Sequence, residues 1–284
     1  LLSYLDISYS GNENPAISES ENIYDKKFFP NLKLSYSENI INNLNSIPIL
    51  YVNEIGFKKY YSKEEVIHKV NLVAKYLRSI GVKKGDRVVG IVTNNAETLI
   101  SFLAVNSIGA VWSSCSPDFG EQAILDRFSQ IEPKILFYSS NYMYGGKKFK
   151  ILEKIKNVES KLNTLEVSIC IDYSQKDKSF IDEKLNFFEE NNRELSELSF
   201  ERCQFNDPMY ILYSSGTTGK PKCIVHNTGG PLIQHLKEQQ LHCEICEDDK
   251  LFYFTTCGWM MWNWLISGLA SKATVVLYEG SPCL

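Results

Sequence analysis

The sequence predicts an α/β protein in which a parallel sheet carries helices on both of its faces. Short apolar runs alternate with segments of helical periodicity, and glycine, proline or polar residues mark most of the junctions between them. The chain has 284 residues, of which 44% are hydrophobic, so its size and composition allow one large core or two domains. The runs predicted as strands are almost wholly apolar, as expected where helices cover both faces.

The first part of the chain differs from the rest. Residues 1–45 are polar and aromatic without clear periodicity, and we interpret them as a covering segment ahead of a domain over residues 46–284. The run at 47–53 predicts a strand that belongs to this cover. A helix follows, because Ser62 and Glu65 have the spacing of a capping box, apolar residues recur at helical spacing, and Gly81 ends the pattern.

Beyond that helix the two patterns alternate regularly. Strands are predicted at 86–92, 110–116, 134–140, 167–171, 209–215, 250–256 and 274–278, and helices at 96–109, 120–131, 151–162, 231–241 and 260–270. This order is typical of successive β-α-β units. Residues 172–206 are charged, rich in asparagine and only weakly periodic, so we expect a surface excursion there.

Charge and cysteine usage narrow the classes of partner. The 30 basic and 34 acidic residues are mixed along the chain and give a net charge of -4, which favours neither nucleic acid nor an anionic membrane. Eight scattered cysteines fit a reducing cytoplasm rather than a disulfide framework. No run approaches the roughly 20 apolar residues that cross a bilayer. The expected partners are therefore small molecules, and the expected location is cytoplasmic.

The segment YSSGTTGKPK, from Tyr213 to Lys222, has the composition of a polyphosphate-binding loop. Glycines let the backbone approach phosphate oxygens, while N–H groups and hydroxyls donate hydrogen bonds. A lysine about 4 Å from a phosphate oxygen contributes roughly 4 kcal/mol near a surface. The spacing does not match a Walker A loop, and an ordinary turn is the alternative. The candidate phosphate-binding residues are Ser214, Ser215, Gly216, Thr217, Thr218, Gly219, Lys220 and Lys222.

These ten contiguous residues resemble the signature of the adenylate-forming superfamily, which includes the acyl-CoA synthetases. The resemblance implies the layered sheets and helices of that superfamily's large N-terminal domain, with ATP, Mg²⁺ and CoA as cofactor and substrates. The later superfamily motifs, including the adenylation lysine and a magnesium-binding acidic residue, have no match here. We therefore interpret the chain as a fragment truncated before the small C-terminal domain, with no metal site or identifiable catalytic residue of its own, and expect it to be inactive alone.

A second resemblance indicates which acid is the substrate. The segments FFPNLKLSYSENII, IVHNTGGPLIQHLKEQQLHCEI and LFYFTTCGWMMWNW resemble the acetoacetyl-CoA synthetase branch. It implies an acyl pocket formed by Trp259, Met260 and Met261, with His226 near the entrance, and a CoA-binding role for Lys147 in MYGGKK. From the residues alone, the Met and Trp cluster could equally be core, the histidine structural and the lysine solvated.

The function expected from these resemblances is the ligation of acetoacetate to CoA through an acyl-adenylate. A synthetase for acetate, propionate or another short acid is the alternative within the class, and a non-catalytic nucleotide-binding module is the alternative outside it.

Cys243 and Cys246 form a CxxC pair, but a structural zinc normally needs four ligands, which makes zinc the weaker interpretation. Cys115, Cys223 and Cys257 are interpreted as buried small residues; many relatives have glycine where Cys223 stands.

Overall fold

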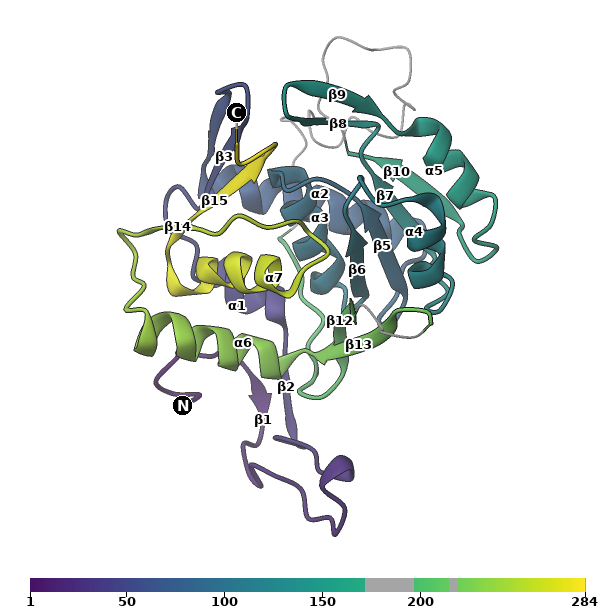
Figure 1. The fold of residues 1–284 in the computed structure, drawn as a ribbon. Coiled ribbons are helices and arrows are strands. Elements are labelled where there is room, and N and C mark those ends of the chain that lie inside the picture. Colours follow the sequence, from purple (N-terminus) through teal and green to yellow (C-terminus); the bar gives the residue numbers. More distant parts are fainter. Residues whose placement is uncertain (172–196, 215–218, 284) are drawn as a thin grey trace.

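The computed structural model describes residues 1–171, 197–214 and 219–283, and a six-stranded sheet lies at its centre (Figure 1). In spatial order the strands are β10 (Val167–Cys170), β7 (Ile135–Tyr138), β5 (Arg87–Ile91), β6 (Val111–Cys115), β12 (Pro208–Ser214) and β13 (Lys222–Asn227). The pairs from β10 to β12 are parallel, which confirms the predicted α/β class. β13 is antiparallel to β12, and no strand was predicted at its position.

A second sheet contains four strands. Their order is β14 (Lys250–Phe252), β15 (Thr274–Glu279), β3 (Ile49–Asn53) and β4 (Lys58–Tyr61), with only the β3 and β4 pair antiparallel. The prediction that the strand near residues 47–53 belongs to a cover is therefore wrong. β3 lies inside this sheet and pairs over its full length with β15, which is more than 200 residues later in the chain.

The remaining strands of the described residues form two smaller sheets. One is β1 (Ser10–Gly11), β2 (Leu32–Leu34) and β11 (Cys203–Gln204); the other is the hairpin of β8 (Asn141–Tyr144) and β9 (Lys147–Lys150). β11 falls inside the range predicted as a surface excursion, yet Cys203 and Phe205 are buried. The rest of that prediction, residues 172–196, lies outside the described residues.

Seven α-helices lie in the described residues; six are close to their predicted positions, and α1 falls where no helix was predicted. They are α1 (Tyr36–Asn42), α2 (Lys63–Ser79), α3 (Ala96–Ser107), α4 (Glu121–Phe128), α5 (Leu152–Glu159), α6 (Gly229–Lys237) and α7 (Met260–Ser267), with short 3-10 turns at Ile23–Asp25 and Gly268–Ser271 and a π turn at Glu238–His242. Ser62 caps α2 as predicted, because its hydroxyl accepts the backbone N–H of Glu65 at 3.2 Å. Among the described residues, no helix is long and apolar enough to span a membrane.

Alternate residues of the central strands belong to two different cores. Val88 and Ile135 pack into the core that the six-stranded sheet shares with α3 and the second sheet, whereas Val89 and Leu136 face α4 and α5. This two-residue alternation is what a strand covered on both faces requires. The prediction of helices on both faces is confirmed.

Helix α3 lies deepest in the molecule, since all 12 of its residues are buried. Near its middle, the ring of Phe102 meets four other aromatic rings at centroid distances between 5.4 and 6.5 Å. These rings belong to Tyr36 of α1, Trp112 of β6, Tyr210 of β12 and Trp262 of α7. The cluster joins the six-stranded sheet to α1 and α7.

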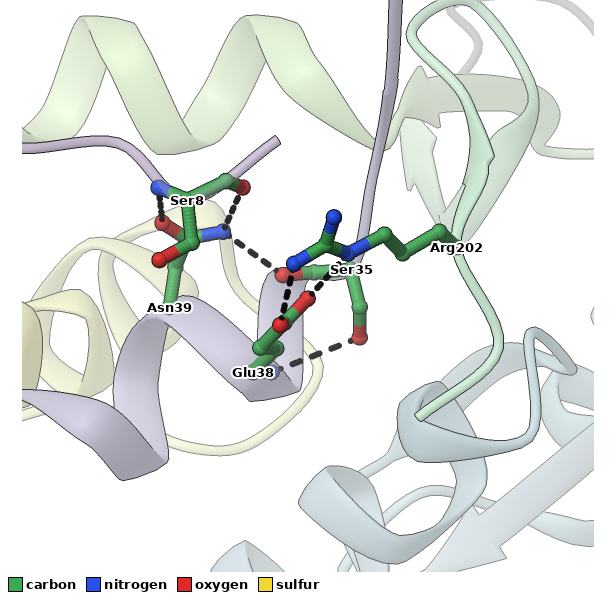
Figure 2. Close-up of polar contacts among 5 residues, drawn as sticks. All are labelled: Ser8, Ser35, Glu38, Asn39 and Arg202. Carbon is green, nitrogen blue, oxygen red and sulfur yellow. Dashed lines mark hydrogen bonds and ion pairs between the residues drawn. The ribbon is translucent and has the colours of Figure 1, made fainter. Parts of the chain in front are cut away.

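The start of α1 binds two distant segments (Figure 2). Arg202 donates two hydrogen bonds to the carboxylate of Glu38, from Nε at 2.8 Å and from Nη2 at 2.6 Å. Asn39 exchanges hydrogen bonds with the backbone of Ser8 and also donates to the carbonyl of Ser35. One helix terminus thereby holds the N-terminal segment and the segment that precedes β12.

A buried polar chain links α1, α6 and α7. The Ser267 hydroxyl donates to the carbonyl of Asn263 at 2.8 Å, so it accepts the Tyr36 hydroxyl at 2.9 Å and Nδ1–H of His235 at 2.7 Å. Burial, with a smaller contribution from the charge of His226, lowers the pKa of His235 to about 4. His235 is therefore neutral at physiological pH.

The bidentate pair predicts a measurable loss of stability. Arg202→Ala leaves the carboxylate of Glu38, whose side chain is only 14% exposed, without its fork of donors. We expect the free energy of unfolding of the chain to fall by about 1.5 to 3 kcal/mol in urea titrations. Lys161→Ala, which removes an exposed ion pair with Glu121, is the control and should cost less than about 1 kcal/mol. Equal losses in the two variants would contradict this assignment.

The buried histidine predicts a pH dependence. Because the folded pKa of His235 lies below the unfolded value, the unfolded chain binds more protons between about pH 6.5 and pH 4, and stability falls as the pH drops through that window. The loss attributable to this residue is on the order of 3 kcal/mol. His235→Gln should flatten the decline of the unfolding free energy over that window, whereas the exposed His242→Gln should leave it unchanged. An unaltered slope in His235→Gln would refute this.

Candidate active site

A pocket opens at the carboxyl ends of parallel strands from both large sheets. Its volume is about 280 Å³. It is lined by residues that follow β5, β6 and β14, by both strands of the β8–β9 hairpin and by the end of β15. The lining residues are Val92, Thr93, Asn94, Ser116, Pro117, Asp118, Tyr142, Met143, Tyr144, Phe149, Phe254, Thr255, Thr256, Tyr278, Glu279 and Gly280. Open α/β sheets commonly bind ligands at this edge.

Hydrogen bonds fix the segment after β14 to the six-stranded sheet. The thiol of Cys257 donates to the carbonyl of Thr93 at 3.3 Å, and the hydroxyl of Ser114 donates to the carbonyl of Cys257 at 2.7 Å. The indole N–H of Trp262 donates to Oδ1 of Asn94 at 2.9 Å. These bonds join the two sheets immediately beside the pocket, so its walls are preorganised.

The pocket is aromatic and weakly acidic. Its charged lining residues are Asp118 and Glu279, and the carboxylate of Glu279 accepts the hydroxyl of Tyr51 at 2.8 Å. Burial and the Glu279 carboxylate both raise the pKa of Tyr51, so this phenol stays protonated. Such a lining suits an uncharged, partly apolar group better than a phosphate.

The β8–β9 hairpin is the feature that sequence reasoning missed. It turns through Gly145 and Gly146, with φ of 59° and 74°, which is the type I′ pattern of a two-residue hairpin loop. Tyr142 and Phe149 stack on it with their centroids 5.0 Å apart and both line the pocket. The glycine pair between short alternating runs was the available signal.

The predicted phosphate loop connects β12 to β13. Ser214 ends β12, Gly219 has φ of 103°, and Lys220 and Lys222 are exposed. The candidates Ser215, Gly216, Thr217 and Thr218 lie outside the described residues. β12 is parallel to β6, so the loop leaves the sheet at the edge where residues after β6 line the pocket.

The predicted acyl-pocket residues are dispersed. Trp259 and Met260 are 65% and 46% exposed, Met261 is partly buried, and none of the three lines the pocket described above. Trp262, the next tryptophan of the same cluster, is fully buried. The Met and Trp cluster is thus divided between surface and core.

His226 is placed away from the phosphate loop. Its ring stacks on Tyr210 with centroids 4.6 Å apart, and burial lowers its pKa. It lies four residues beyond Lys222 along β13, a distance of about 13 Å in an extended strand. The structure does not bring it to the pocket lining.

Lys147 is exposed at the start of β9, directly after the hairpin turn, with pocket residues on the strand opposite. Within the described residues, no group of three or more His, Cys, Asp or Glu side chains could hold a metal. Cys115 and Cys257 are buried as predicted, but Cys223 is only half-buried, because it lies on the edge strand β13.

Comparison with known proteins places these features in context. Residues 49–284 match the family described as "AMP-binding enzyme". The chain is 43% identical over 288 residues to the acetoacetyl-CoA synthetase of Mus musculus and 41% identical over 278 residues to the acetoacetyl-coenzyme A synthetase of Rhizobium meliloti (strain 1021). The alignments cover 97% and 94% of this chain.

The fold is also similar to that of a solved structure. The acetoacetyl-CoA synthetase from Streptomyces lividans superposes with a TM-score of 0.90 at 35% identity, over 99% of this chain and 44% of that one. The chain spans 43% and 42% of the mouse and Rhizobium relatives. It therefore corresponds to less than half of each of these proteins.

The division of the Met and Trp cluster predicts that two tryptophan substitutions lower the stability by very different amounts. Trp262→Ala should lower the free energy of unfolding of the 284-residue chain by about 3 to 5 kcal/mol, because it empties a fully buried volume and orphans Asn94. Trp259→Ala should cost less than about 1 kcal/mol. Urea denaturation measures both, and a larger loss for Trp259→Ala would show that the cluster packs differently.

Proposed function

This chain belongs to the AMP-binding enzyme family, and on that premise we propose that the protein containing it ligates acetoacetate to CoA. The observation that supports this proposal best is the similarity to proteins named acetoacetyl-CoA synthetases over nearly the whole chain. The alignments include the loop at Tyr213 to Lys222 and the segment around Trp259.

The proposed reaction has two steps. A carboxylate oxygen of acetoacetate attacks the α-phosphorus of ATP, and pyrophosphate leaves to give an acyl-adenylate. The sulfur of the CoA thiolate then attacks the acyl carbon, the bond to the phosphate oxygen breaks, and AMP leaves. Both steps depend mainly on positioning and on neutralising phosphate charge.

The residues of this chain take part chiefly in the binding of phosphates and acid. The loop from Ser214 to Lys222 would hold the β- and γ-phosphates of ATP, with Lys220 and Lys222 exposed to reach them. Trp259, Met260 and Met261 would frame the acyl group, and His226 would lie near that entrance. Magnesium would neutralise charge on ATP, but the described residues offer no acidic cluster for it.

The hairpin and the pocket suggest how CoA would lie. Lys147, Lys148 and Lys150 are exposed on β9, whereas the pocket beside them is aromatic and carries carboxylates. Phosphate groups would therefore bind on the outside of the hairpin, and the uncharged arm that ends in the thiol would enter the pocket.

Exchange of labelled pyrophosphate into ATP by the full-length protein tests the proposal. We expect rapid exchange with acetoacetate and at least roughly tenfold slower exchange with acetate at equal concentration, since a site that binds a keto oxygen loses that bond with acetate. Rapid exchange with acetate and none with acetoacetate would refute the proposed substrate. No exchange with any short acid would favour a non-catalytic nucleotide-binding module.

A further inference from the structure

Glu54 is a buried acidic residue outside the predicted phosphate-binding, acyl and CoA residues. It directly follows β3 and is only 7% exposed. Its carboxylate accepts three backbone N–H groups: Oε1 from Gly146 at 2.9 Å, and Oε2 from Gly145 at 2.9 Å and from Ser281 at 2.8 Å. Its own N–H donates to the carbonyl of Glu279 at 3.0 Å. One side chain thus joins the hairpin turn to the segment that follows β15.

The two segments that Glu54 joins are two walls of the pocket. The hairpin contributes Tyr142, Met143, Tyr144 and Phe149, and the end of β15 contributes Tyr278, Glu279 and Gly280. The hairpin forms a two-stranded sheet of its own, separate from both large sheets. Because an isolated two-stranded hairpin is marginally stable in water, a buried link at its turn has a large effect on where it rests.

The charge of Glu54 suits this role. Burial alone would raise its pKa, but the hydrogen bonds from Ser281, Gly146 and Gly145 outweigh burial and lower it, so the carboxylate is ionised at physiological pH. Hydrogen bonds from N–H groups to an ionised acceptor are roughly twice as strong as neutral ones. They also occupy the turn's N–H groups, which are therefore not open to a phosphate.

We propose that Glu54 is a positioning residue that fixes the β8–β9 hairpin against the end of β15 and thereby sets the CoA-binding wall of the pocket. The role acts on the second step of the reaction and rests on the proposed function. The first step requires the loop after β12, whereas in the described part of the chain the Glu54 carboxylate bonds to the hairpin turn and to Ser281.

Glu54→Gln in the full-length protein tests this role, because glutamine keeps the volume but has one acceptor oxygen and sets an NH₂ group against the N–H donors. We expect the KM for CoA to rise by roughly tenfold or more, while pyrophosphate exchange with acetoacetate stays within about twofold. Hydrogen exchange of peptides covering residues 141–150 should also become faster. Glu65→Gln, at a half-buried ion pair with Lys59, is the matched control and should change none of these readouts.

A second variant keeps the carboxylate and disturbs its place. A Cβ at Gly280 would lie 2.5 Å from Cβ of Glu54, so Gly280→Ala should displace the side chain and loosen the hairpin in the same hydrogen-exchange assay. An unchanged KM for CoA with unchanged hairpin protection in Glu54→Gln would overturn the proposal. If the wild-type protein shows no acetoacetate-dependent exchange, the proposed function fails, while hairpin protection still decides whether Glu54 holds the turn.

Discussion

The structure depends on the complete burial of α3 between two sheets. A helix hidden on every side must be apolar or have its polar side chains hydrogen-bonded. Seven of the 12 residues of α3 are apolar, and each of the five polar side chains makes a hydrogen bond: Glu97, Thr98, Ser101, Asn106 and Ser107. Phe102 then fixes the neighbours, because its ring packs against α1, β6, β12 and α7. Edge-to-face contacts of this kind add about 0.5 to 1.5 kcal/mol each beyond burial. Residues of the second sheet, such as Ile49 and Val275, belong to the same buried core as α3, so the two sheets meet across this helix.

The sequence predicted the elements whose signals are local. Alternating apolar runs and caps such as Ser62 marked the central strands and the helices from α2 onward to within a few residues, whereas α1 was not predicted. β13 was missed because its residues, Lys222 to Asn227, look like the end of a loop, and only pairing with β12 makes them a strand. The assignment of β3 failed for the same reason, since nothing near Ile49 indicates that its partner is β15. Partners far away in the sequence leave no trace in local periodicity.

The parts of the candidate site also differ in whether the sequence could predict them. A phosphate-binding loop could be predicted because the residue types on which the prediction rests lie within ten contiguous residues. The pocket could not, because its lining comes from segments as distant as Val92 and Gly280, and no short spacing relates them. Glu54 carries no sequence signal at all: among 34 acidic residues, only the fold shows that its carboxylate meets three N–H groups. Conversely, the Met and Trp segment looked uniform in sequence, although Trp259 is exposed and Trp262 is buried.

The distribution of charge around the pocket indicates where the phosphates of the two proposed substrates would bind. We call two sets of exposed lysines the rims of the proposed site: Lys220 and Lys222 beyond β12, and Lys147 on the hairpin. Asp118 and Glu279 line the pocket. Two polyanionic substrates can approach such a site only with their phosphates on different rims, since phosphates placed together inside would face both each other and the carboxylates. The thiol is the end of CoA that is far from its phosphates, and acetoacetate carries a single carboxylate, so the reacting groups would meet between the rims. A small shift of the hairpin would move one rim relative to the other. In this proposal the buried carboxylate of Glu54, which restrains the hairpin turn, therefore matters for the transfer to CoA and has little effect on the formation of the acyl-adenylate.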